Sequence, residues 1–112
     1  MGAVFLDQRL TLEARDDAPD GAGGRGGAWV TLGELWGSLK ASRGALRERD
    51  AAPVSRIGWT ITVRAAPIGA PERPLAGQRF RLGDRRFRIL AVAEKDARAR
   101  LLRCFCEEER LT

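Results

Sequence analysis

Arginine side chains are the most chemically distinctive groups in this sequence, and they gather in one short segment of its last third. Five of them fall between Arg79 and Arg88, and only Asp84 offsets their charge. A guanidinium presents several N–H donors in one plane and binds carboxylates or phosphates. Because the whole chain has a formal net charge of +5, the cluster indicates an anionic partner of one of these two kinds.

The arginines alternate with apolar residues on either side of Gly83–Asp84, which predicts a β-hairpin with a two-residue loop. Such a loop places Phe80 opposite Phe87 on one face of the hairpin. The other face, called the arginine face below, pairs like with like: Arg81 with Arg86, and Arg79 with Arg88. Like charges directly opposite each other destabilise a ladder by roughly a few tenths of a kcal/mol per pair. We therefore expect the arginine face either to splay into water or to meet acidic groups of another molecule.

The residue types that most enzymes use for acid–base or nucleophilic chemistry are missing. The sequence has no histidine and no tyrosine, which removes the usual general base near neutral pH and the commonest metal ligand. Adjacent carboxylates such as Glu107 and Glu108 point to opposite faces of a strand, and Asp16 and Asp17 start a polar loop. We therefore predict that the protein is not an enzyme and needs no cofactor or metal.

Cys104 and Cys106 stand two residues apart on a predicted strand. Their side chains then point the same way with Cβ atoms roughly 7 Å apart, whereas a disulfide needs about 4 Å. Two thiolates without a histidine also make a poor zinc site. We expect two small buried thiols in a reduced compartment.

A sequence of 112 residues has the size of one domain, which we place over residues 1–112. Its apolar stretches are too short to cross a bilayer, and its N-terminal residues carry no cationic leader, so we predict no membrane association and synthesis in the cytoplasm. Residues 16–27 form a glycine-rich loop that lacks the Gly-Lys-Ser/Thr ending of a phosphate cradle. We therefore expect no bound nucleotide.

Alternation of apolar and polar residues predicts β-strands along most of the sequence. Gln8–Arg15 and Val54–Arg64 each alternate over several residues, and three further strands are expected between Gln78 and Glu107. Residues 28–41 are typical of extended structure, with a break between two strands at Gly33–Glu34. The strands are short and are separated by glycine-rich or proline-rich turns.

A short helix is predicted over residues 42–52, because Ser42 can cap it and Pro53 lies just past its end. Residues 65–76 contain three prolines, which favour an extended, polyproline-like loop. About six short strands and one short helix indicate a mainly β fold. We predict a small closed β-barrel or sandwich with long loops, since closure removes the sheet edges that would otherwise aggregate.

Both faces of the predicted strands turn apolar from Ile89 to Val92 and from Leu101 to Phe105, which indicates strands covered on both sides. The aromatic side chains share faces with aliphatic ones and are mostly expected in the core: Trp29, Trp36, Trp59, Phe80, Phe87 and Phe105. An alternative uses these rings as stacking platforms for bases. The protein would then be a small basic barrel that binds single-stranded nucleic acid, with an affinity that falls steeply with salt.

The order of these segments resembles the phage head-tail joining proteins, also called head-completion or stopper proteins, of long-tailed phages and gene transfer agents. The resemblance runs from Leu6 to Glu108. Its motifs lie at residues 8–12, Trp29, residues 36–39, residues 44–50, residues 59–64, residues 86–89 and Cys104. None of these motifs is catalytic, and their order and spacing together carry the resemblance.

Membership of that family implies a structural subunit in the neck of a phage or phage-like particle, assembled in the bacterial cytoplasm. Copies of the chain, on the order of six or twelve, form a cyclic ring. The ring sits between the adaptor ring beneath the portal and the tail terminator or tail tube. Double-stranded DNA passes through it without sequence specificity, and its loops narrow the channel so that packaged DNA stays in.

The resemblance and the charge pattern together suggest which residues meet partners. Six arginines are expected to contact acidic residues of an adjacent subunit or of the adaptor: Arg79, Arg81, Arg86, Arg88, Arg43 and Arg47. Two loops are expected to reach the channel or the next ring: the glycine-rich loop with Gly23, Gly24 and Arg25, and the proline-rich loop with Pro67, Pro71 and Arg73.

Overall fold

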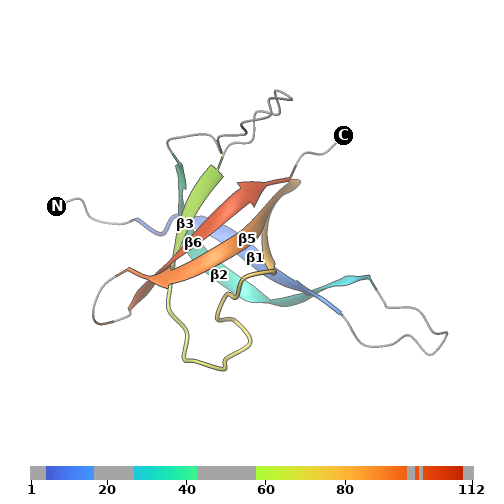
Figure 1. Ribbon diagram of the computed structural model, residues 1–112, viewed down its shortest axis with the longest axis horizontal. Helices are drawn as coiled ribbons and strands as arrows, with labels where there is room; N and C mark the ends of the chain where they lie inside the picture. Colours follow the sequence, from blue (N-terminus) through green and yellow to red (C-terminus); the bar gives the residue numbers. More distant parts are fainter. Residues whose placement is uncertain (1–4, 17–26, 43–57, 96–97, 99, 110–112) are drawn as a thin grey trace.

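The computed structural model describes residues 5–16, 27–42, 58–95, 98 and 100–109, and its regular elements there are all strands. They are β1 (Gln8–Arg15), β2 (Trp29–Ala41), β3 (Gly58–Arg64), β4 (Arg79–Leu82), β5 (Arg85–Glu94) and β6 (Leu101–Glu108). The strands pair in antiparallel fashion and close into a barrel in the order β1-β2-β3-β6-β5-β4 (Figure 1). Closure leaves no free sheet edge. The prediction of a mainly β closed barrel of about six strands is confirmed.

The strand β1 begins and ends where the alternation predicted, whereas the break expected in its partner β2 is wrong. The long strand β2 continues through Gly33–Glu34. A β-bulge accommodates the irregular stretch: Leu12 lies opposite Gly33, while Glu13 lies opposite Thr31. One residue of β2 is therefore extra, and the bulge bends the strand without ending it.

The hairpin β4–β5 has the two-residue loop and the register that its sequence predicted. Gly83 in the loop has a φ of 60°, a left-handed conformation that glycine adopts without steric cost. The ladder pairs Phe80 with Phe87. On the opposite face it pairs the arginines: Arg79 with Arg88, and Arg81 with Arg86.

The core fills the barrel with inward-facing side chains of β1, β3, β4, β5 and β6. Its buried apolar members are Leu10, Leu12, Ile61, Val63, Phe80, Phe87, Ile89, Leu102, Cys104 and Cys106. The strand β2 approaches this core closely at Gly37, where an added Cβ atom would lie 2.6 Å from Cδ1 of Leu10. A side chain larger than hydrogen does not fit there without displacing the core.

The expectation that the aromatic residues lie mostly in the core is right for some rings and wrong for two. Phe80 and Phe87 are fully buried, and Trp59 packs edge-on against Phe87 with ring centroids 5.9 Å apart. Trp36, by contrast, is 55% exposed and Phe105 is 40% exposed. Each of these two neighbours an inward-facing residue on its own strand, so alternation turns it outward.

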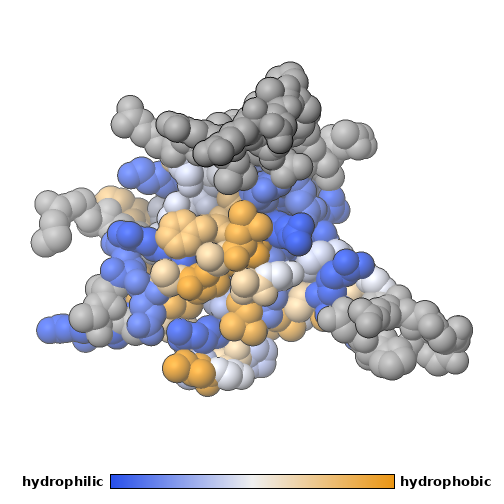
Figure 2. Space-filling model, in the orientation of Figure 1, coloured by the Kyte–Doolittle hydropathy of each residue, from blue (hydrophilic) through white to orange (hydrophobic). Residues whose placement is uncertain are grey.

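The prediction that β5 and β6 are covered on both sides is also wrong. Leu90 is 46% exposed and lies with Phe105 on the outside of the barrel. A second β-bulge explains the arrangement in β5, where Ile89 lies opposite Cys106 but Ala91 lies opposite Phe105. Figure 2 shows apolar side chains gathered on the face that β5 and β6 cross.

The loop between β3 and β4, drawn in yellow in Figure 1, is not polyproline-like, so that prediction is wrong. It folds into successive turns, in which the N–H of Ala70 donates to the carbonyl of Pro67 and the N–H of Arg73 donates to the carbonyl of Ala70, both at 3.0 Å. Gly69 has a φ of 89°, which permits the chain reversal. Pro74 of the same loop is fully buried.

The helix predicted over residues 42–52 lies outside the described residues except for Ser42, which directly follows the last residue of β2. Within the described part of the chain, no helix has the length and apolar character needed to span a membrane.

Candidate functional site

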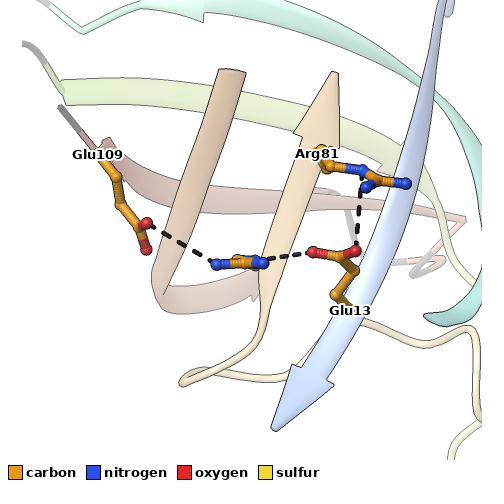
Figure 3. Close-up of polar contacts among 4 residues, drawn as sticks. Glu13, Arg81 and Glu109 are labelled. Atoms are coloured by element: carbon orange, nitrogen blue, oxygen red, sulfur yellow. Dashed lines mark hydrogen bonds and ion pairs between the residues drawn. The ribbon is translucent and has the colours of Figure 1, made fainter. Parts of the chain in front are cut away.

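The arginine face lies on the outer side of β4 and β5, and a carboxylate of the same chain forms ion pairs with two of its arginines. Glu13 of β1 lies opposite Arg79 of β4 in the ladder that closes the barrel. Nε of Arg79 donates a hydrogen bond of 2.7 Å to Oε1 of Glu13, and Nε of Arg81 lies 3.7 Å from Oε2 (Figure 3). Glu13 is only 5% exposed. The expectation that this face meets only water or another molecule is therefore wrong for Arg79.

Arg79 is further held by groups on either side of it. Its guanidinium carbon lies 4.0 Å from the centre of the Trp29 ring, which places the cation over the face of the indole. On the other side, Nη1 lies 3.9 Å from a carboxylate oxygen of Glu109, just past the end of β6 (Figure 3). Arg79 thus joins β1, β2 and β4 to the end of β6.

The rest of the arginine face is less well compensated. Arg81 is exposed and reaches only the far oxygen of Glu13. The Nε atom of Arg86 is buried and has no hydrogen-bond partner. Arg88 is exposed and lies opposite Glu107 in the β5–β6 ladder, although among the described residues no ion pair joins Arg86 or Arg88 to a carboxylate. A buried unpaired donor beside exposed guanidinium groups leaves this wall with an unmet capacity for anions.

A second ion pair lies at the tip of the hairpin, where sequence reasoning had predicted no contact. Nε and Nη2 of Arg85 donate to the two carboxylate oxygens of Glu108 at 2.8 and 3.0 Å. The Arg85 hydrogen bond lowers the pKa of the Glu108 carboxyl below its ordinary value, and Glu108 in turn raises the pKa of Arg85. The Arg85 guanidinium also lies within 5.0 Å of the ring centres of Trp59 and Phe87. This pair therefore closes one end of the barrel over two core aromatics.

The remaining residues predicted to meet partners divide into described and undescribed ones. Pro67 and Pro71 are exposed on the turns of the β3–β4 loop. Arg73 contacts its own chain. Its Nη1 donates a hydrogen bond of 2.8 Å to the Ala66 carbonyl, and its Nη2 lies 3.9 Å from a carboxylate oxygen of Glu94. The other predicted residues lie outside the described part of the chain: Arg43, Arg47, Gly23, Gly24 and Arg25. Ile68, which sequence reasoning did not single out, is 86% exposed on the same loop.

The two cysteines are free, buried and directed toward the core, as the sequence predicted. Burial raises the pKa of Cys104 to about 12 and raises that of Cys106 as well, where the neighbouring Cys104 adds to the effect. A thiol that stays protonated at neutral pH is a poor nucleophile and a poor metal ligand. The described residues also contain no cluster of three or more cysteine and carboxylate side chains that could hold a metal ion.

With the barrel and its arginine face established, comparison with known proteins gives the family. A family model described as phage head completion protein matches residues 1–109. The chain belongs to the phage head completion protein family. The chain is also similar to a solved chain from the virion of a native gene transfer agent particle, with 41% sequence identity and a TM-score of 0.78. The match covers all of both chains. No curated protein matches the sequence significantly.

The family and the solved chain both indicate that this protein is a structural component of a phage or gene transfer agent particle. The chain forms a closed barrel, with arginines on the outer face of β4 and β5 and exposed apolar side chains on other strands. These features are typical of a protein that acts by contact with neighbours. The family resemblance inferred from sequence motifs is thereby confirmed.

Proposed function

We propose that this chain forms a closed ring in the neck of a phage or phage-like particle, where the ring joins the DNA-filled head to the tail. The ring lies between the adaptor and portal on one side and the tail terminator or tail tube on the other. Double-stranded DNA passes through its centre without sequence-specific contacts. The match to a chain of a gene transfer agent virion supports assembly into a particle of this kind.

The observation that carries the proposal is the incomplete compensation of the arginine face. Arg79 is satisfied by Glu13, but Arg81 and Arg88 remain exposed and Arg86 keeps an unpaired buried donor. Guanidinium groups placed opposite one another on a ladder repel, and carboxylates of a neighbour relieve that repulsion. These arginines therefore bind acidic residues of the adaptor or of the adjacent subunit, with Arg43 and Arg47 as further candidates.

The loops have a separate role in this proposal. The β3–β4 loop exposes Ile68, Pro67 and Pro71 beyond the barrel wall, and Arg73 anchors the loop to the barrel through the Ala66 carbonyl. Backbone turns and the buried Pro74 hold it in shape. The loop can therefore present an apolar tip to the channel or to the next ring, together with the glycine-rich loop around Gly23, Gly24 and Arg25. Such loops narrow the channel and retain DNA.

The test replaces exposed arginines while leaving the paired Arg79 in place. In particles that carry Arg81→Gln and Arg88→Gln together, we expect heads without tails, or heads that have lost DNA, in negative-stain images. The matched control is Arg64→Gln with Arg98→Gln, which removes the same charge from exposed positions elsewhere. The control should give DNA-filled, tailed particles. Normal particles from the Arg81/Arg88 variant would remove the role proposed for the arginine face.

A further inference from the structure

A hollow of about 1120 Å³ lies on the outer side of β2, β3 and β6. The strands β3 and β6 run side by side toward the left of the barrel in Figure 1, and β2 pairs with the other edge of β3. The ladder register places six lining residues in two rows of neighbours: Lys40, Thr60 and Phe105 in one, and Ser38, Thr62 and Arg103 in the other. Lys95, directly after β5, lines it as well. We call this surface the lysine hollow.

The lysine hollow gathers cations that have no counter-charge. It contains both lysines of the sequence, Lys40 and Lys95. Among the described residues, neither lysine nor Arg103 forms an ion pair with a carboxylate. Arg85 also reaches the hollow, but its guanidinium is bound to Glu108. The described lining includes a single carboxylate, that of Asp7, so three uncompensated cations outnumber it.

Hydroxyl groups lie between these cations. Thr62 points outward, because it alternates with Ile61 and Val63 of the core, yet it is only 8% exposed and forms part of the floor. Oγ of Ser42 and Oγ1 of Thr60 lie 3.2 Å apart in a hydrogen bond. Lysine, arginine, serine and threonine side chains are among the groups that bind phosphate oxygens in protein–DNA complexes. The lysine hollow thus has the donors that a phosphate backbone requires.

A protein segment is the competing occupant, since Phe5, Trp59 and Phe105 also line the hollow. Protein–protein interfaces, however, are depleted in lysine and serine and enriched in arginine. The arginine face has that second composition. The lysine hollow instead holds both lysines of the sequence together with Ser38 and Ser42. Its composition therefore favours phosphate over an acidic protein surface.

The lysine hollow and the arginine face lie on different sides of the barrel. The hollow is centred on β3, and two other strands separate β3 from β4 in either direction around the closed order. The hollow reaches the hairpin tip at Arg85, but its lining includes none of the four arginines of the arginine face. The two cationic surfaces can therefore bind different partners at the same time.

We propose that the lysine hollow binds the phosphate backbone of the DNA that passes through the neck, so that β2, β3 and β6 form the channel side of each subunit. The inference rests on the proposed ring function and assigns one surface of the barrel to DNA. It leaves the arginine face for protein partners. Contacts with phosphates carry no base information, which suits a channel through which every sequence must pass.

Photo-cross-linking in DNA-filled particles tests which molecule occupies the hollow. An encoded p-azidophenylalanine in place of Ser38 puts the reactive group on the lining. The matched control carries the same group in place of Thr11, another half-buried hydroxyl residue, which lies opposite Arg81 beside the arginine face. After illumination we expect DNA linked to the protein from position 38, and none from position 11 above the level in the dark.

Every other outcome overturns the assignment. Links from position 38 to protein alone would show that a protein segment fills the hollow. Equal DNA links from both positions would show that DNA does not distinguish the two surfaces. No link from position 38, in filled particles with a normal amount of the protein, would also overturn it. Deletion of the gene tests the ring function separately: filled, tailed particles remove that function, whereas leaking heads without DNA links from position 38 remove the hollow alone.

The salt dependence of DNA binding provides a second measurement on the purified chain. Lys40→Gln with Arg103→Gln should reduce the slope of log affinity against log salt by about two, because each lost phosphate contact removes about one. Arg81→Gln with Arg88→Gln removes the same charge from the arginine face and should change the slope by less than about one. Equal slopes for the two double variants, measured with a short labelled duplex, would contradict the role given to the lysine hollow.

Discussion

Two ion pairs flank the hairpin β4–β5, and they differ in what surrounds them. At one end Glu13 is almost fully buried, and its two oxygens face Arg79 and Arg81. At the other end Arg85 and Glu108 make a two-bond contact that stays partly open to water. The first pair lies in the short β1–β4 ladder that closes the barrel, and the second covers its rim. Burial, more than the number of hydrogen bonds, should therefore decide which pair matters for stability.

The largest effect is expected from Glu13→Gln. This change leaves Arg79 without its buried counter-charge, and removal of one partner of a buried pair costs a few kcal/mol. Since the amide can still accept one hydrogen bond, we expect the free energy of unfolding to fall by about 2 to 3 kcal/mol. Urea denaturation of the purified chain measures the difference.

A double variant, Glu13→Leu with Arg79→Leu, controls for the charge left behind. Apolar replacement of both partners of a buried pair is often nearly neutral, so the double variant should recover to within about 1 kcal/mol of the unaltered chain. If Glu13→Gln proved no more destabilising than Glu108→Gln, burial would not distinguish the two pairs, and the comparison would fail.

A smaller loss should follow from Trp29→Leu at the buried pair. The indole face lies under the Arg79 guanidinium at 4.0 Å, and a cation–π contact of this kind contributes about 1 kcal/mol. We expect a loss of that size in the free energy of unfolding. In the Arg79→Leu background the same Trp29 change should cost measurably less, and a double-mutant cycle gives the coupling energy. Equal costs in both backgrounds would show that Arg79 and Trp29 do not interact.

The contrast between the two pairs also shows what the sequence could predict. The register of the hairpin followed from its two-residue loop, because that loop fixes which residues lie opposite each other. The partner of Arg79 did not follow, since Glu13 lies 66 positions away and shares its strand face with Arg9 and Thr11, which read as solvent-facing. Only closure of the barrel between β1 and β4 brings the two together. A non-local pairing of this kind leaves no trace in local alternation.

The sequence analysis wrongly expected several exposed apolar residues to be buried, and the reason is related. An apolar run such as Ile89 to Val92 indicates that its side chains avoid water, but it does not say which molecule covers them. In the barrel the bulge beside Ile89 turns Leu90 and Ala91 to the outer face. Trp36 was expected in the core for the same reason and faces outward. Sequence periodicity thus predicted the barrel well and could not tell an apolar side chain of the core from an apolar side chain on the outer surface.

The smallest effect is expected from the partly exposed pair, and its sign depends on pH. Arg85 lowers the pKa of Glu108 below its ordinary value of 4.5. A carboxyl whose pKa is lower in the folded state adds stability above its unfolded pKa, and this stability is lost as the pH falls through the folded pKa. Glu108→Gln should therefore cost less than about 1 kcal/mol at pH 7. The loss of stability caused by Glu108→Gln should become smaller below about pH 4.5. Glu108 of the unaltered chain is then progressively protonated, so it too loses its charge and its ion pair with Arg85. Urea denaturation of both chains across this range measures it, and a difference that grew on acidification would show that Arg85 does not favour the charged carboxylate.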